Sequence, residues 1–205
     1  MQSQLILIAP ILGLLSACAT TGGSDMTPGG ADFDTLVAEG TDIFARYGTA
    51  AETAPADLPG GVVTYNGVAL FQGPNWTVEG ARNNPETAGV LQLLADFDNN
   101  MISGTVTDVS GPTGSSILAI TLDDGVISGN TVTGLIGGTF PYTVKTPDDV
   151  PDIMETADIF GTFEANFLGA AGEALSGTLS GSATLRDING DTEIAAFGGA
   201  LLAER

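Results

Sequence analysis

The sequence predicts an all-β fold, an eight-stranded antiparallel up-and-down β-barrel preceded by a short N-terminal helix and a tether. The clearest observation is period-two alternation in residues 159–167 and 175–185, where apolar residues or glycine alternate with Thr, Ser, Glu or Asn. Such alternation is typical of strands with one buried face. The 29 glycines and 6% aromatic content suit short strands and tight turns. The alternating runs follow one another with only turns or loops between them, which favours a closed meander over the alternative, a two-sheet sandwich.

Eight runs are the expected strands, and turn residues or loops separate them. Asp123-Asp124-Gly125 has the composition of a turn between the fourth and fifth runs, and Asn66-Gly67 predicts a bulge or kink within the first. Two long loops are expected at 72–87 and 140–158. The expected strands are residues 62–71, 89–97, 102–107, 117–122, 126–139, 159–167, 175–185 and 193–203.

The N-terminus reads as an export signal, which we assign to residues 1–17. Its apolar run, 5–15, is too short for a comfortable membrane span and ends in small residues. The tetrapeptide Leu15-Ser16-Ala17-Cys18 resembles the lipobox of bacterial lipoproteins. That resemblance implies cleavage before Cys18, lipidation of Cys18 and, because Ala19 follows, sorting to the outer membrane. An ordinary signal peptide with a chance cysteine is the alternative.

Residues 18–60 are expected to form a lipidated tether that contains one helix, at about 33–47. Gly, Thr and Pro dominate its first part. Apolar residues then recur at helical spacing from Phe33 to Tyr47, and Gly48 provides a stop. A second linker with Pro55 and Pro59 precedes the barrel domain, which we assign to residues 61–205.

The charge of the chain excludes several functions. Five Lys and Arg against 25 Asp and Glu give a net charge of -20, so we expect no nucleic-acid partner. With no histidine and one cysteine, the chain has no intrachain disulfide, and we expect no metal, no cofactor and no enzymatic activity. Residues 187–193 superficially resemble a calcium loop, but the loop is short and its glycine comes one place early, which favours a hairpin turn.

Several stretches resemble the lipoproteins related to transferrin-binding protein B. The segment F-L-G-A-A-G-E-A-L-S-G, residues 167–177, is similar to the family signature F-Y-G-x-x-A-E-E-x-G-G and keeps Phe167, Gly169, Glu173 and Gly177. Residues 95–104 resemble the family's D-F-x-N-x-x-L-x-G hairpin, and residues 194–199 resemble its closing strand. The resemblance implies one eight-stranded barrel lobe, without a handle domain, on an acylated tether. From the residues themselves, Gly169 and Gly177 suit a tightly curved wall, and Glu173 suits a turn in which it accepts hydrogen bonds from backbone amides.

The leading functional hypothesis is a monomeric lipoprotein, anchored on the surface or the periplasmic face of the outer membrane, whose barrel captures a solute or a protein. Trp76, Arg82 and Tyr142, in the two long loops, are the candidate contacts with this unknown ligand. A lipocalin-like carrier of a small apolar ligand is a second hypothesis, and it needs an open barrel interior. A structural surface lipoprotein without a ligand is the third. The side chains expected to fill the interior are Phe71, Phe97, Phe163, Phe167 and Leu179.

Overall fold

The computed structural model describes residues 32–73, 82, 85–111, 114–144, 153–186 and 192–205. The expected signal peptide, Cys18 and the segment 187–191 lie outside the described residues. Some residues in the strands are described by their backbone only, among them 114–119, 140–144, 153–157 and 185–186.

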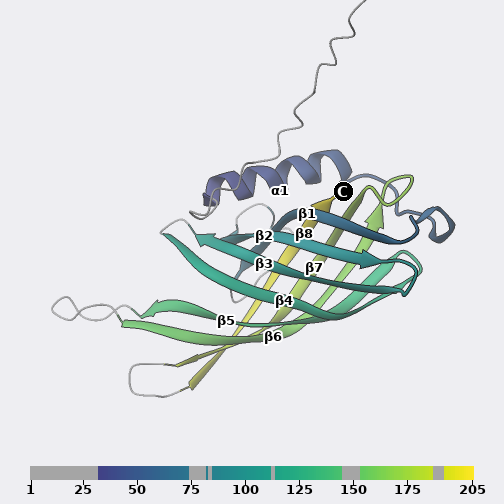
Figure 1. Cartoon of the computed structure of the whole chain (residues 1–205). Helices are drawn as coiled ribbons and strands as arrows, with labels where there is room; N and C mark the ends of the chain where they lie inside the picture. The colour runs from purple at the N-terminus through teal and green to yellow at the C-terminus, as the bar shows by residue number, and fades with distance from the viewer. Residues whose placement is uncertain (1–31, 74–81, 83–84, 112–113, 145–152, 187–191) are drawn as a thin grey trace, which may run out of the picture.

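Eight antiparallel strands close into a barrel in which each strand pairs with its neighbours in sequence and the last pairs with the first (Figure 1). This confirms the expected fold, and the sandwich alternative is wrong. Where the wall is closed, no strand edge is left free to pair with another chain. The strands are β1 (Val62–Gln72), β2 (Thr87–Asp96), β3 (Met101–Gly111), β4 (Gly114–Ser128), β5 (Thr131–Val144), β6 (Ile153–Leu168), β7 (Ala174–Arg186) and β8 (Thr192–Glu204).

The boundary between β4 and β5 differs from the expectation. Asp123-Asp124-Gly125 is not a turn between strands but a bulge within β4, where the pairing with β5 shifts between Asp123 and Val126. The turn itself comes after Ser128, where Gly129 has φ 63°. The prediction was wrong because an Asp-Asp-Gly sequence suits a bulge as well as a turn, and only the pairing with both neighbours distinguishes them.

The expected loop 140–158 is largely strand. β5 continues to Val144 and β6 begins at Ile153, and these two residues are paired. Pro141 lies opposite Thr156 in this hairpin, and a proline within a run is a reason to reject a strand. The two strands reach beyond the rest of the barrel at the left of Figure 1.

The bulge allowed for at Asn66-Gly67 is absent, because β1 pairs with β2 in one continuous register from Val62 to Phe71. The glycine has a different reason. A Cβ at Gly67 would lie 2.7 Å from the Cα of Ala203 and closer still to the carbonyl oxygen of Leu202. Gly67 therefore allows β8 to approach β1 closely.

The interior of the described barrel is packed with side chains from alternate positions of the strands. Phe167 is 0% exposed, and its ring centroid lies 5.7 Å from that of Tyr65 and 5.1 Å from that of Phe97. The five side chains expected to fill the interior all belong to this cluster or pack against it. Its large members include Tyr65, Leu91, Leu93, Leu122, Ile136, Phe163, Phe167, Leu175 and Leu179.

The helix α1 (Phe33–Tyr47) confirms the helical prediction and lies along the outside of the barrel over β1, β2 and β8 (Figure 1). Its buried face, Leu36 and Ile43, packs against outward-facing Val68, Leu70 and Leu202. The Arg46 guanidinium pairs with the Glu204 carboxylate at 2.6 Å. Within the described residues, no helix combines the length and the apolar character needed to cross a bilayer.

The linker after the helix is also held against the barrel. The Thr53 amide donates to the Phe167 carbonyl at 2.9 Å, and the Gly169 amide donates to the Ala51 carbonyl at 2.9 Å. The Glu52 carboxylate accepts from the side-chain amides of Asn130 at 2.8 Å and Asn166 at 3.1 Å. Residues 51–53 are therefore an ordered strap rather than a free tether.

Replacing Phe167 by alanine should lower the free energy of unfolding by about 3–5 kcal/mol, because a fully buried ring between two aromatic neighbours is lost. Phe160→Ala, on the same strand, is the matched control. Its ring is 65% exposed, so its effect should stay within about 0.5 kcal/mol. Urea unfolding of both variants checks this, and similar losses in the two would contradict the packing described above.

Candidate functional site

The three expected loop contacts do not come together as one described surface. Trp76 lies outside the described residues. Tyr142 belongs to β5, with its backbone opposite Glu155, and its side chain is not among those described. Arg82 is described, and its guanidinium carbon lies 4.4 Å from the centroid of the Phe44 ring on α1. Arg82 thus joins the β1–β2 connection to the helix.

The family signature forms the turn between β6 and β7. Gly169 has φ 90° and Gly172 has φ 71°, a region that favours glycine. The Tyr65 hydroxyl donates to the Gly172 carbonyl at 2.8 Å and so ties the turn to the core. Burial raises the pKa of Tyr65 to about 12, so this hydroxyl remains a donor at physiological pH.

Glu173 holds the same turn from the outside. Its Oε2 accepts a hydrogen bond from the Ala171 amide at 3.0 Å. That hydrogen bond is the main reason why the pKa of Glu173 lies below its usual value, and the nearby Arg205 charge lowers it a little further. These contacts stabilise the turn. A candidate ligand site has to be sought elsewhere on the described surface.

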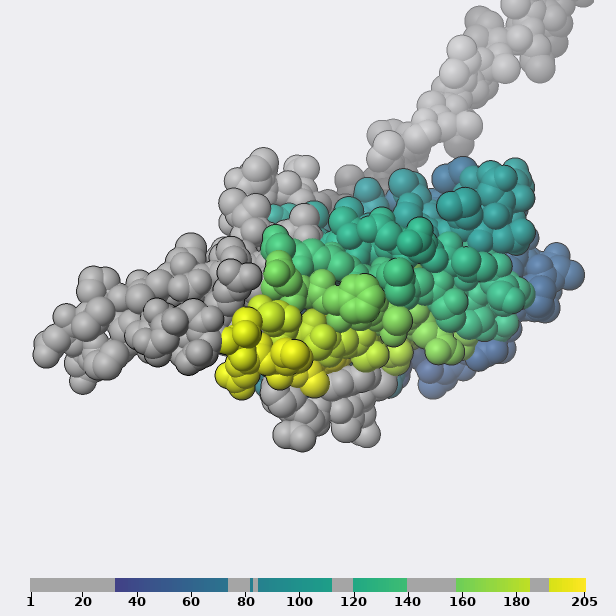
Figure 2. All heavy atoms as spheres, turned by 90° about the horizontal axis from the view of Figure 1, so that it is seen from below, coloured from purple at the N-terminus to yellow at the C-terminus, as the bar shows by residue number. Residues whose placement is uncertain are grey.

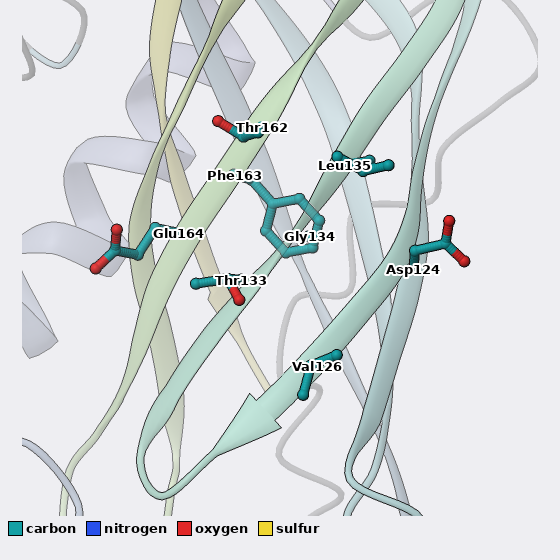
Figure 3. A pocket seen from close by; sticks show the side chains of 8 residues that line it. All are labelled: Asp124, Val126, Thr133, Gly134, Leu135, Thr162, Phe163 and Glu164. Carbon is teal, nitrogen blue, oxygen red and sulfur yellow. The ribbon is translucent and has the colours of Figure 1, made fainter.

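A hollow on the outer wall is the strongest described candidate for a binding site. It has a volume of about 500 Å³ and opens where β4, β5 and β6 run side by side (Figure 3). The hollow is open to solvent rather than enclosed. Figure 2 shows the face of the barrel to which these strands belong, on the side away from α1. The residues lining the hollow are Asp124, Val126, Thr133, Gly134, Leu135, Thr162, Phe163 and Glu164.

The bulge in β4 and a glycine in β5 create this hollow. The bulge interrupts the pairing with β5 beside Val126. Gly134 has no side chain, and the Phe163 ring from β6 lies against it: a Cβ at Gly134 would be 2.5 Å from the ring and 2.8 Å from the Cα of Gly125. Phe163 is only 2% exposed, so the ring supports the wall from within while the outward side chains form the rim.

The rim combines exposed apolar side chains with carboxylates. Val126 is 53% exposed and Leu135 is 38% exposed. Asp124 and Glu164 lie on opposite sides of the hollow in Figure 3. Asp124 has φ 49° and belongs to the bulge, so the same irregularity that opens the wall also sets a carboxylate at its edge.

Sequence reasoning missed this hollow. Its signals are Asp123-Asp124-Gly125, which the sequence predicts as a turn, and Gly134, which lies inside the expected strand 126–139. Nothing in the alternation shows that these two irregularities lie on neighbouring strands. Within the described part of the chain, no group of three or more His, Cys, Asp or Glu side chains could hold a metal ion.

The closed antiparallel barrel, with its filled interior, defines a β-barrel lobe. A family model described as the C-lobe and N-lobe beta barrels of Tf-binding protein B matches residues 58–202. Because the match covers more than half of the chain, this chain belongs to that family. The resemblance inferred from residues 167–177, from the hairpin at 95–104 and from the closing strand at 194–199 is thereby confirmed. No curated protein matches the chain.

The signature glycine Gly177 should not tolerate alanine. An added Cβ would lie 2.5 Å from the Cα of Ala165 and would also clash with the carbonyl oxygen of Glu164, so we expect a loss of about 1–3 kcal/mol from overpacking. At Gly137, also within a strand, the nearest atom that an added Cβ would meet is the Ile159 carbonyl oxygen, 3.9 Å away. Gly137→Ala should therefore be neutral or slightly stabilising. Thermal unfolding of both variants distinguishes a steric requirement from general sensitivity to loss of glycine.

Glu173→Gln should destabilise the protein at neutral pH but not at low pH. The pKa of Glu173 is lower in the folded chain than its ordinary value of 4.5, so its contribution is complete above about pH 5 and is lost as the pH falls through the folded-state pKa. Urea midpoints of wild type and variant should therefore converge as the pH is lowered below about 4. A difference that stays constant across this range would show that ionisation of Glu173 does not matter.

Proposed function

We propose that this chain is an outer-membrane lipoprotein, anchored through an acylated Cys18 and exposed at the cell surface, whose barrel serves as a binding module for a partner protein. The observation that carries the proposal is the contrast between a filled interior and an open hollow on the outer wall. The lipobox-like Leu15-Ser16-Ala17-Cys18 supports the anchor. Membership in a family described by the barrels of Tf-binding protein B supports a binding role.

The filled interior favours protein capture over the carriage of a small apolar ligand. A carrier barrel keeps a cavity between its walls, whereas the aromatic side chains of Tyr65, Phe163 and Phe167 occupy that space here. A partner therefore has to approach from outside. The exposed, apolar rim of the hollow gives it a surface to contact, which a purely structural lipoprotein does not need.

The outward face supports a barrel that is tethered to the membrane rather than inserted in it. A barrel wall in contact with lipid presents an apolar band. Here many outward positions along the strands are exposed and polar, including Thr64, Gln92, Ser103, Thr105, Thr162 and Glu164. We further propose that the protein has no catalytic activity, since the chain contains no histidine and a single lysine.

Anchoring and exposure can be tested together on intact cells that express the full chain. Protease added outside the cells should cleave the wild-type protein, and Cys18→Ala should release the protein into the medium or remove it from the envelope fraction. Cys18→Ser should behave like Cys18→Ala, because neither variant carries the thiol that is acylated. Full protection of the wild-type protein would contradict surface exposure, and envelope retention of both variants would contradict the lipid anchor.

A further inference from the structure

We infer that the outer wall around the hollow docks a segment of a partner protein that combines apolar side chains with lysine or arginine. This inference deepens the proposed function, on which it rests, by naming the surface and the chemistry of the partner. It is carried by three features of the described residues: a continuous row of exposed apolar side chains, the hollow beneath that row, and the sign of the charges around it.

The apolar row crosses four neighbouring strands. Met101 on β3 lies directly opposite Val126 on β4, and Val126 lies opposite Thr133 on β5. Leu135, two residues along β5, lies opposite Thr162, and Phe160 is two residues from Thr162 on β6. Side chains that are directly or diagonally opposite on one face are about 5–8 Å apart. Met101, Val126, Leu135 and Phe160 are all large, exposed apolar residues, so they form a connected strip rather than scattered ones.

The hollow gives this strip depth. Val126 and Leu135 belong both to the apolar row and to the rim, and Thr162 lies between Leu135 and Phe160. A side chain of a partner can therefore enter the hollow on the outer face of β4, β5 and β6 while its neighbours lie on the apolar wall on either side. Buried apolar anchors in such depressions supply most of the energy of typical protein interfaces.

The described charges at this site are all negative. Asp124 and Glu164 line the hollow, and Asp123 is paired with Leu135 in the register. The described arginines lie elsewhere. Arg46 pairs with Glu204 on β8, and Arg82 lies over the Phe44 ring on α1. The backbone amide of Arg205 donates to the Glu173 carbonyl. Lysine or arginine on the partner would complement these carboxylates. A second copy of this chain would place acid against acid, and anionic lipid headgroups would be repelled.

The test uses the full chain in a mild detergent and a defined probe, a short fluorescent peptide of alternating leucine and lysine. A matched peptide of leucine and glutamate controls for apolar binding alone. At about 0.15 M salt, where long-range attraction to the net negative charge is screened, only the lysine peptide should bind. Leu135→Thr should weaken its binding about tenfold, and Asp124→Asn should weaken it about threefold.

Two control variants change the same chemistry away from the hollow. Ile194→Thr removes an exposed apolar side chain on β8, and Asp42→Asn removes an exposed carboxylate on α1. Both should leave the affinity of the lysine peptide within about twofold of wild type. Equal losses in the control and hollow variants, or equal binding of the glutamate peptide, would overturn the inference. Self-association of the full chain that Leu135→Thr abolishes would overturn it too, in favour of a second copy.

Failure here is distinct from failure of the proposed function. A chain that is anchored and cleaved at the cell surface, but that binds no lysine peptide at the hollow, keeps the role of a surface binding module and loses this docking surface. A chain that binds the peptide through Leu135 and Asp124, but is fully protected in intact cells, keeps the docking surface and loses surface exposure.

Discussion

The pairing of β1 with β8 is the contact on which the rest of the structure depends, because it turns a meander of strands into a closed wall with an inside and an outside. The seam needs close approach. Gly67 and Gly199 both lie where an added Cβ would collide with backbone of the opposite strand. Once the seam is closed, alternate side chains are committed to a core around Phe167, and the remaining positions are committed to the outer face.

The N-terminal segment protects this closure. α1 packs over the seam, with Leu36 and Ile43 against residues of β1 and β8, and the Arg46–Glu204 ion pair adds a polar contact at the end of β8. Burial and the neighbouring Glu204 charge raise the pKa of Glu39 in the same contact, while Arg46 opposes them. The strap at residues 51–53 then bonds to the turn that follows β6. The composition of residues 18–60 suggests a tether, but α1 and residues 51–53 pack against the barrel and cover part of it.

The side of the barrel formed by β4, β5 and β6 carries the hollow. There the β4 bulge and Gly134 relax the regular pleat, and the Phe163 ring compensates by filling the space behind the glycine. Bulges occur where a wall must bend or where a side chain must be redirected. In this barrel one local irregularity opens a hollow, sets Asp124 at its edge and leaves Val126 and Leu135 exposed, whereas the core beneath stays packed.

By itself the sequence determined the strand count, the up-and-down order, the helix and the family. Period-two and helical spacing are local patterns, which can be recognised without knowing which residues pair across strands. It did not determine where β4 ends, how far β5 and β6 extend past Pro141, or that Gly67 serves an inter-strand contact. It also did not reveal the hollow, since Asp124, Leu135 and Glu164 are adjacent only through register. Register depends on pairing between strands, and pairing is decided when the barrel closes.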